Sequence, residues 1–320
     1  MLPARLQHEF GIFGGQAGSH VLEVVERLRT PLITTLHTVL SRPDPAQHAV
    51  LVGLAGASRR LVVMSERGRR MLGEVYDVPD SKIDVIAHGI PDLPFADTGA
   101  AKAALGYAGR SVILTFGLLA PSKGIEIMIE AMPRVLAGTP SAVYVVLGAT
   151  HPNLLRTEGE AYREGLHARV RALGLEDSVV FLDRFVDQAT LIRFIAMCDV
   201  YVTPYLNEEQ MTSGTLAYSF GLGKAVVSTP YWHARDLLSG GLGRLVPFGD
   251  VDAMARAVSE LLENASVGDA IRREAYRLGR GMIWSAAGQD YLRSIGRAIR
   301  PAARGMAPER ANALRLVLAR

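Results

Sequence analysis

Two segments of the sequence place phosphate-binding chemistry directly after an apolar run. In the first, the run ends at Gly117, and Lys123 follows at the start of a predicted helix. A lysine there is a compact cation beside the positive end of the helix dipole, an arrangement that suits a phosphate. A solvated lysine in an ordinary loop would give the same pattern. The spacing GxxxxGK[ST] of the Walker loop is absent.

The second segment is an acidic, amide-rich loop that leads into another predicted helix. Glu209 and Gln210 precede Ser213, Gly214 and Thr215. Hydroxyl and backbone donors at a helix start can bind a diphosphate, and the preceding carboxylate and amide suit sugar hydroxyls. A plain helix cap is the alternative interpretation.

Histidines mark two further segments near the beginning of the chain. His37 directly follows a buried apolar run, and His8 and Glu9 precede a turn that contains Gly14 and Gly15. A glycine-rich turn allows a ligand to approach the backbone closely. Each histidine could equally be structural.

Other site classes are missing from the sequence. It has no HExxH, no cysteine cluster, no paired-histidine spacing and no GxSxG elbow, which argues against hydrolases of those classes. The single cysteine, Cys198, excludes an internal disulfide and fits a reducing compartment.

The elements that must position these residues alternate between strand and helix patterns. Short apolar runs rich in β-branched residues predict strands in a parallel sheet covered on both faces, so the fold class is α/β. The predicted strands are Pro31–Leu36, Arg60–Met64, Lys82–Ile86, Ser111–Phe116, Ala142–Leu147, Val179–Leu182, Val200–Thr203, Ala225–Ser228 and Arg244–Val246. The predicted helices include Ile125–Leu136, Ala161–Leu173, Val251–Leu262 and Trp284–Arg300.

The chain of 320 residues has room for two domains. We expect a partial domain at 1–90, a nucleotide-binding domain at 91–284, and a C-terminal helix and tail at 285–320. The first has only about three predicted strands, below the six of a Rossmann unit.

Composition excludes several classes of protein. With 49% apolar and 21% charged residues, the chain has the composition of an ordinary globular protein. Its formal charge is only +3 and its basic residues are dispersed, which argues against a nucleic-acid-binding protein. No apolar run reaches the length of a membrane helix, so we expect a cytoplasmic protein, with peripheral contact at the inner membrane face left open.

Ordered motifs resemble one known family. They are Ile83–Ile90, Gly117–Gly124, Val145–Gly148, Val179–Phe185, Cys198–Pro204, Gly223–Val227 and Arg244–Asp250. Together they resemble the retaining nucleotide-sugar glycosyltransferases of family 4, the group 1 glycosyl transferases. That resemblance covers residues 30–265 and implies a GT-B fold of two facing Rossmann-like domains, the N-terminal one incomplete.

The resemblance also implies a role for each candidate residue. The implied catalytic residues are His37, Glu209 and Gln210; the donor and phosphate residues are Gly117, Lys123, Ser213, Gly214, Thr215 and Tyr218; the base-binding residues are Arg184 and Phe185; and the acceptor-side residues are His8, Glu9, Gly14 and Gly15. The implied reaction moves a hexosyl group, with retention, from a nucleoside diphosphate sugar to a glycan, lipid or small-molecule acceptor. It needs no metal or cofactor, and the nucleotide sugar is a co-substrate.

Three departures from the family pattern bear on activity. Leu118 replaces the phosphate arginine, and Gln210 and Tyr218 stand where the family has two glutamates, with Glu209 one residue earlier. Against the family pattern, the first part of the N-terminal domain is missing, so we expect either a fragment or completion by another subunit. The alternatives are a non-catalytic sugar-nucleotide-binding protein on the same fold, or a related epimerase.

Overall fold

The structure is a computed structural model that describes residues 2–299, and these form two compact units. Unit 1 contains the residues up to Gly89, the short segment Glu209–Thr212 and the helix that starts at Trp284. Unit 2 contains Ile90–Glu208 and Ser213–Ile283. The chain therefore passes from one unit to the other at four points.

Unit 1 is built on a four-stranded parallel sheet with the strand order β1-β2-β3-β4. Its strands are β1 (Ala4–His8), β2 (Leu32–Leu36), β3 (Arg60–Val63) and β4 (Ile83–Val85). The sequence patterns predict about three strands here, and β1 is not among them. The reason is that β1 alternates between partly buried and exposed residues until His8, so it lacks the continuous apolar run of its neighbours.

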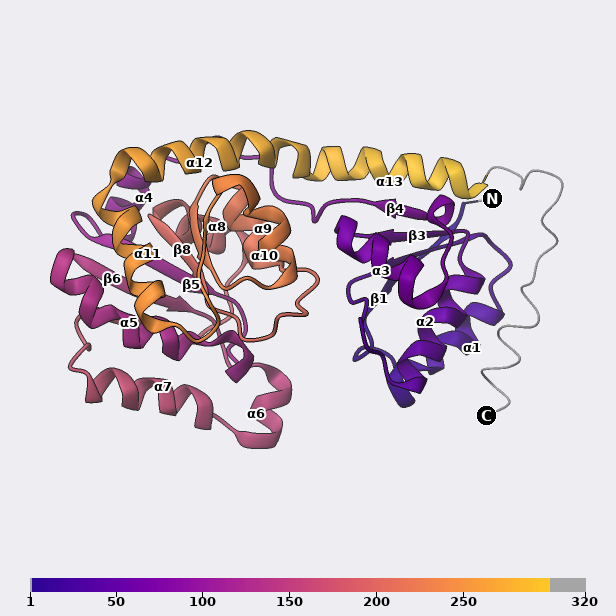
Figure 1. Ribbon diagram of the computed structural model, residues 1–320, viewed down its shortest axis with the longest axis horizontal. Helices are drawn as coiled ribbons and strands as arrows, with labels where there is room; N and C mark the ends of the chain where they lie inside the picture. The colour runs from indigo at the N-terminus through magenta and orange to yellow at the C-terminus, as the bar shows by residue number, and fades with distance from the viewer. Residues whose placement is uncertain (1, 300–320) are drawn as a thin grey trace. The chain divides into compact units, whose positions relative to one another are not determined.

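Helices cover both faces of the unit 1 sheet (Figure 1). These helices are α1 (His20–Glu26), α2 (Pro45–Ala57), α3 (Glu66–Tyr76) and α13 (Trp284–Ile299). Leu32 packs with Leu22 of α1 and Leu54 of α2, whereas the next residue, Ile33, packs with Ala287 of α13. Successive side chains of a strand point to opposite faces, so these two contacts place α1 and α2 on one face and α13 on the other.

Unit 2 is built on a six-stranded parallel sheet with the order β10-β9-β8-β5-β6-β7. Its strands are β5 (Ser111–Phe116), β6 (Ala142–Leu147), β7 (Val179–Leu182), β8 (Val200–Thr203), β9 (Ala225–Ser228) and β10 (Arg244–Leu245). This is the doubly wound Rossmann order: successive strands are added outward from β5 on one side and outward from β8 on the other, so the strand order reverses between these two strands. The predicted α/β class with parallel sheets is confirmed in both units.

The helices of unit 2 lie between these strands, before the first of them and after the last. They are α4 (Thr98–Leu105), α5 (Ile125–Gly138), α6 (Pro152–Glu158), α7 (Ala161–Ala172), α8 (Gln188–Met197), α9 (Gly214–Gly221), α10 (Trp232–Leu237), α11 (Val251–Glu263) and α12 (Ala265–Gly279). Met128 of α5 and Val258 of α11 are fully buried in one apolar cluster with Tyr144 of β6. α7 ends one residue before the predicted end, and Gly174 adopts the left-handed conformation, with φ of 63°, that favours glycine after a helix.

The segment that follows the expected boundary at residue 90 carries α4 and lies in unit 2. The C-terminal helix begins at Trp284 and packs in unit 1, whereas residues 300–320 of the expected tail lie outside the described residues. Among the helices of residues 2–299, none combines the length and the apolar character needed to span a bilayer.

Candidate functional site

The switch point of unit 2 lies between β5 and β8, and both candidate phosphate segments begin there. Strands β5 and β8 are hydrogen-bonded neighbours, and their connections run to opposite sides of the sheet. Lys123 lies in the loop after β5, and Tyr205 lies in the loop after β8. Ligands of open α/β sheets bind outside the carboxyl ends of the strands at such a point.

A chain of contacts joins Lys123 to the start of α9. The Lys123 ammonium lies 3.9 Å from the centre of the Tyr205 ring. The Tyr205 hydroxyl is 3.0 Å from Oγ1 of Thr215, which is 3.1 Å from Oγ of Ser213. Tyr205 is itself buried and stacked on Tyr231, with ring centres 5.1 Å apart. The cation and the helix start are therefore held on one rigid aromatic support.

Ser213 is the N-cap of α9. Its Oγ accepts a hydrogen bond from the amide of Leu216 at 3.2 Å, and its own amide donates to Nδ1 of His233 at 2.9 Å. Gly214 and Thr215 are the first two residues of the helix. The amides of a first helical turn lack intrahelical acceptors and carry the positive end of the dipole, so this end can bind an anion.

Two glycines allow the turns after β5 and β6 to touch. A Cβ on Gly148 would lie 1.8 Å from the carbonyl oxygen of Gly117, and Gly117 has φ of 124°. A Cβ on Gly117 would lie 3.3 Å from Cγ2 of Thr215. The predicted residue Gly117 thus lies beside the start of α9, where its lack of a side chain leaves the space open.

The two predicted base-binding residues follow β7, which is an edge strand. Arg184 is exposed, and the Phe185 side chain is 84% exposed. Tyr218, predicted on the donor side, lies one turn into α9, and its hydroxyl is 3.3 Å from Nε2 of Gln188. A phenol here gives one neutral hydroxyl in place of the carboxylate that the family pattern has.

The predicted residues of unit 1 gather at the carboxyl ends of β1 and β2. Nε2 of His37 is 2.8 Å from Oε1 of Gln7, and the His37 amide donates to the His8 carbonyl at 3.1 Å. The Glu9 carboxylate accepts from Oγ1 of Thr38 at 2.6 Å and from the amide of Phe10 at 2.9 Å. Burial lowers the pKa of His37, and the charge of Glu9 opposes that effect.

His8 lies beneath this edge as a fully buried side chain. Its ring stacks with Phe13 and meets Phe10 edge to face, and neither ring nitrogen has a hydrogen-bond partner among the described residues. Burial, with a smaller effect of His37, lowers the pKa of His8 to about 4. The imidazole is therefore neutral at pH 7.

Glu209 and Gln210 are grouped with unit 1, although the segments before and after them belong to unit 2. Oε1 of Glu209 accepts a hydrogen bond from Oγ of Ser41 at 2.6 Å, and Nε2 of Gln210 donates to the Thr212 carbonyl at 2.6 Å. The structure thus brings Glu209 into the same unit as His37. Sequence spacing alone gives no sign of this grouping.

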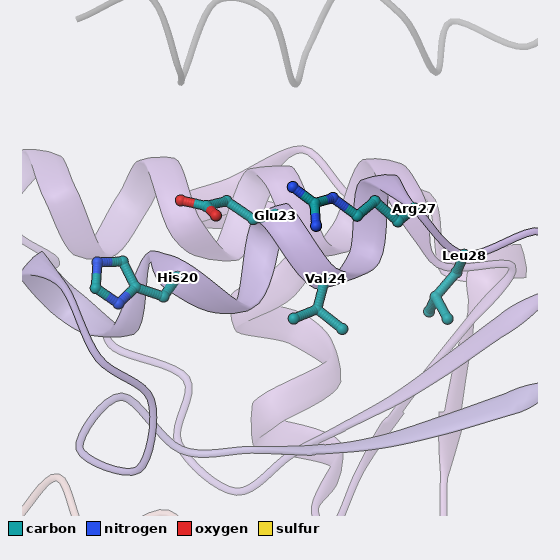
Figure 2. Close-up of a pocket in the computed structure, with 5 residues that line it drawn as sticks. All are labelled: His20, Glu23, Val24, Arg27 and Leu28. Atoms are coloured by element: carbon teal, nitrogen blue, oxygen red, sulfur yellow. The ribbon is translucent and has the colours of Figure 1, made fainter.

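Gly14 and Gly15 are exposed, and both lie against the ring of His20. A Cβ on Gly14 would lie 2.6 Å from Nδ1 of His20, and one on Gly15 would lie 2.7 Å from Cδ2 of the same ring. The pocket drawn in Figure 2 is lined by His20 at one end of α1 and by Leu28 beyond the other end. Its volume is about 620 Å³. None of the predicted site residues lines this cavity.

The structure adds two residues to these edges that the sequence patterns do not select. One is Tyr205, which supports Lys123, and the other is His88. His88 is the third residue after β4, whereas His37 directly follows β2. Nδ1 of His88 is 2.9 Å from the Gly89 carbonyl oxygen, and burial lowers the pKa of His88, an effect that this hydrogen bond opposes and His37 increases. The signal that selects His37, a histidine directly after a predicted strand, does not select His88.

Comparison with protein families gives two matches that together cover most of the chain. Residues 110–264 match the family described as "Glycosyl transferases group 1", and residues 9–92 match "Glycosyltransferase Family 4". A D-inositol 3-phosphate glycosyltransferase of Kineococcus radiotolerans is 27% identical over 95% of this chain and 74% of its own length. A phosphatidyl-myo-inositol mannosyltransferase of Mycolicibacterium smegmatis is 28% identical over 73% of this chain and 56% of its own length. The chain thus spans about half to three quarters of these two relatives.

Solved structures show the same fold. The Anabaena protein HepE in complex with UDP and glucose has a TM-score of 0.69 at 21% identity, covering 84% of this chain and 72% of that one. Sucrose-phosphate synthase of Thermosynechococcus elongatus has a TM-score of 0.74 at 18% identity, covering 92% and 74%. These likenesses show two Rossmann-like domains of the GT-B type. With the family matches over both units, they show that the chain belongs to the family 4, or group 1, glycosyltransferases.

Proposed function

We propose that this protein transfers a hexosyl group from a nucleoside diphosphate sugar to a hydroxyl of its acceptor, with retention of configuration. The observation that carries the proposal is the contact chain from Lys123 through Tyr205 and Thr215 to Ser213. It places a cation and the start of α9 on one support at the switch point of a nucleotide-binding fold.

The donor half of the reaction depends on charge. When the bond between the sugar carbon and the diphosphate oxygen breaks, the electron pair stays on the diphosphate. Lys123 and the amides at the start of α9 are positioned by the fold before the reaction, so they stabilise that charge without reorganisation. In this proposal they do so without a metal ion, and Arg184 and Phe185 bind the base.

The acceptor half requires attack on the same face of the sugar. The acceptor oxygen forms the new bond as the diphosphate leaves, and its proton passes to a diphosphate oxygen. No side-chain nucleophile is required by this route. His37, Glu209 and Gln210 would position the donor sugar. Glu9, Gly14 and Gly15 would form the acceptor side, and the buried His8 would support that side from beneath.

The names of the relatives suggest acceptors to test. One is named for inositol 3-phosphate, another for phosphatidyl-myo-inositol, and a mannosyltransferase of Rhizobium leguminosarum for the lipopolysaccharide core. We propose a polyol, glycan or lipid-linked hydroxyl as the acceptor class. The donors to screen are the glucose and mannose esters of UDP, GDP and ADP.

Calorimetry tests the donor site. We expect one of UDP, GDP or ADP to bind, and Lys123→Ala to weaken that binding about tenfold or more, since a charge-assisted contact is lost. Arg134→Ala is the matched control, because it removes a positive charge from an exposed position on α5, whose start lies beside Lys123. Absence of binding by all three nucleotides, or equal affinity in the Lys123 variant, would contradict the proposal.

A product assay tests the transfer itself. An α-linked donor should give an α-linked product by NMR, and EDTA should leave the rate unchanged.

The second candidate is a non-catalytic nucleotide-sugar-binding protein, favoured by the phenol of Tyr218 at a glutamate position. It predicts nucleotide binding with no product from any donor and acceptor pair, and a related epimerase predicts an altered donor sugar instead.

A further inference from the structure

A line of hydrogen bonds on the unit 1 sheet ends at the imidazole of His37. Gln7 of β1 lies opposite Thr35 of β2 in the parallel ladder, so the two side chains leave the same face of the sheet. Nε2 of Gln7 donates to Oγ1 of Thr35 at 3.4 Å, and Oε1 of Gln7 is 2.8 Å from Nε2 of His37. The glutamine amide therefore links the buried threonine to the histidine ring.

Helix α13 holds the other end of this line. The Tyr291 hydroxyl is 3.1 Å from Oγ1 of Thr35. The guanidinium carbon of Arg5, two residues before Gln7 on β1, lies 4.5 Å from the centre of the Tyr291 ring. The backbone of His37 is fixed separately, because its amide continues the ladder to the His8 carbonyl. Ring and backbone of His37 thus depend on different contacts.

The direction of these bonds determines which ring nitrogen of His37 carries the proton. An amide oxygen only accepts and an amide NH2 only donates. Because the NH2 of Gln7 donates to Thr35, the oxygen faces His37, and Nε2 of His37 must be the donor. Nδ1 is then a bare acceptor, and no group among residues 2–299 is hydrogen-bonded to it.

The partner of this ring is a neutral amide and not a carboxylate. The nearby Glu9 carboxylate is occupied by the Thr38 hydroxyl and the Phe10 amide. In a histidine that takes up a proton during catalysis, a bonded carboxylate stabilises the imidazolium, and Gln7 cannot do so. Burial also lowers the pKa of His37, so the ring is neutral at pH 7. The arrangement suits a fixed hydrogen-bond acceptor better than a general base.

We propose that Gln7 is a positioning residue that holds His37 in the tautomer with a bare Nδ1, and that this nitrogen accepts a hydrogen bond from a hydroxyl of the donor sugar. The contact with the sugar rests on the proposed function, whereas the tautomer depends on unit 1 alone. The competing arrangement has the Gln7 amide turned over. Its NH2 would then donate to His37, and Nδ1 would carry the proton.

Two substitutions of Gln7 separate these arrangements. Gln7 is exposed, so a charged side chain at this position stays solvated. Glutamate can only accept and should leave the proton on Nε2, whereas lysine can only donate and should move it to Nδ1. The nitrogen chemical shifts of the imidazole, recorded at a pH where the ring is neutral, identify the tautomer. Gln16→Glu and Gln16→Lys are the matched controls, since Gln16 is another exposed glutamine of unit 1, and both should leave His37 unchanged.

A proton on Nδ1 in the unsubstituted protein overturns the proposal. So does one and the same tautomer in Gln7→Glu and Gln7→Lys. These spectra need neither donor nor acceptor, so they decide the tautomer even where no sugar transfer is found. Absence of transfer would contradict the proposed function alone.

Transfer kinetics test the contact with the sugar. We expect Gln7→Glu to keep most of the kcat and Gln7→Lys to lower it about tenfold, since an N–H would replace the acceptor that the sugar hydroxyl needs. The affinity for the nucleotide without its sugar, measured by calorimetry, should be the same in both variants. Equal losses of kcat in the two variants would mean that Nδ1 makes no such contact.

Discussion

At the scale of the residue, Tyr205 joins the two parts of the proposed donor site. Its ring supports the Lys123 ammonium from one side, and its hydroxyl reaches Thr215 on α9. The two functions can be separated, because the ring and the hydroxyl contact different partners. A phenylalanine keeps the ring and loses the hydroxyl, whereas a leucine loses both.

We expect Tyr205→Leu to weaken nucleotide binding about tenfold and Tyr205→Phe to weaken it less. A cation–π contact is worth roughly 0.5–2 kcal/mol, and about 1.4 kcal/mol is a factor of ten in affinity. Calorimetry measures both variants, and thermal unfolding checks that each retains its fold, since Tyr205 also stacks on Tyr231. Equal losses in the two variants would show that the ring makes no separate contribution.

His8 makes the stability of unit 1 depend on pH. Burial lowers its folded-state pKa to about 4 from 6.5, so the unfolded state binds more protons between these values. The contribution of the neutral His8 to the free energy of unfolding is therefore present above pH 6.5 and is lost as the pH falls toward 4. The loss is on the order of 3 kcal/mol. Urea unfolding of the chain from pH 7.5 down to pH 4.5 measures this slope.

The variant His8→Leu should reduce that slope without removing it, because His37 and His88 also have lowered pKa values. His20→Gln is the matched control, since His20 is an exposed histidine of the same unit. An unchanged slope in the His8 variant would mean that the buried imidazole does not resist protonation.

At the scale of the element, the start of α9 should contribute to both folding and binding. Ser213→Ala removes the cap from the Leu216 amide and should cost about 1 kcal/mol of stability. It should also weaken nucleotide binding several-fold, because the helix start loses its order. Asp187→Ala removes an equivalent cap from α8, where Asp187 accepts from the Thr190 amide at 2.7 Å. The Asp187→Ala control should lose stability, measured by unfolding, and keep its nucleotide affinity, measured by calorimetry.

The contact between the turns after β5 and β6 gives a second prediction at this scale. Gly148→Ala would place a methyl group 1.8 Å from the Gly117 carbonyl oxygen, so the turn after β5 must move. We expect loss of nucleotide binding and reduced stability. Gly165→Ala lies on α7 with no atom within 4 Å of the new Cβ, and should raise stability by about 0.5–1 kcal/mol. Normal binding by the Gly148 variant would mean that the turn adapts.

The elements found from the sequence were those with a local signal. β5, β6, β7, β8 and β9 have the predicted bounds, because each is a continuous apolar run between polar residues. β1 and Tyr205 were missed for the opposite reason. β1 has alternating burial, and the importance of Tyr205 comes from contacts with Lys123 and Thr215 that only the folded sheet creates.

At the scale of the molecule, the chain's organisation is not a simple succession of domains. Four residues in the middle of unit 2's sequence, Glu209–Thr212, group with unit 1, as does the last described helix, α13. The hydrogen bonds from Ser41 to Glu209 and from Ser65 to the Met211 sulfur, at 3.2 Å, hold that segment. Spacing within a motif cannot reveal such grouping, because it depends on contacts between residues more than a hundred positions apart.

The single cysteine allows the unfolding of unit 2 to be followed inside the whole protein. Cys198 is fully buried, and burial raises the pKa of its thiol to about 12, so it reacts with a thiol reagent only when unit 2 opens. A nucleotide that binds folded unit 2 stabilises it by about 2.7 kcal/mol at a hundred times its dissociation constant. We therefore expect nucleotide to slow the labelling of Cys198 about a hundredfold. The Lys123→Ala variant should need proportionally more nucleotide for the same protection. Labelling at equal rates with and without nucleotide would place the binding site outside unit 2.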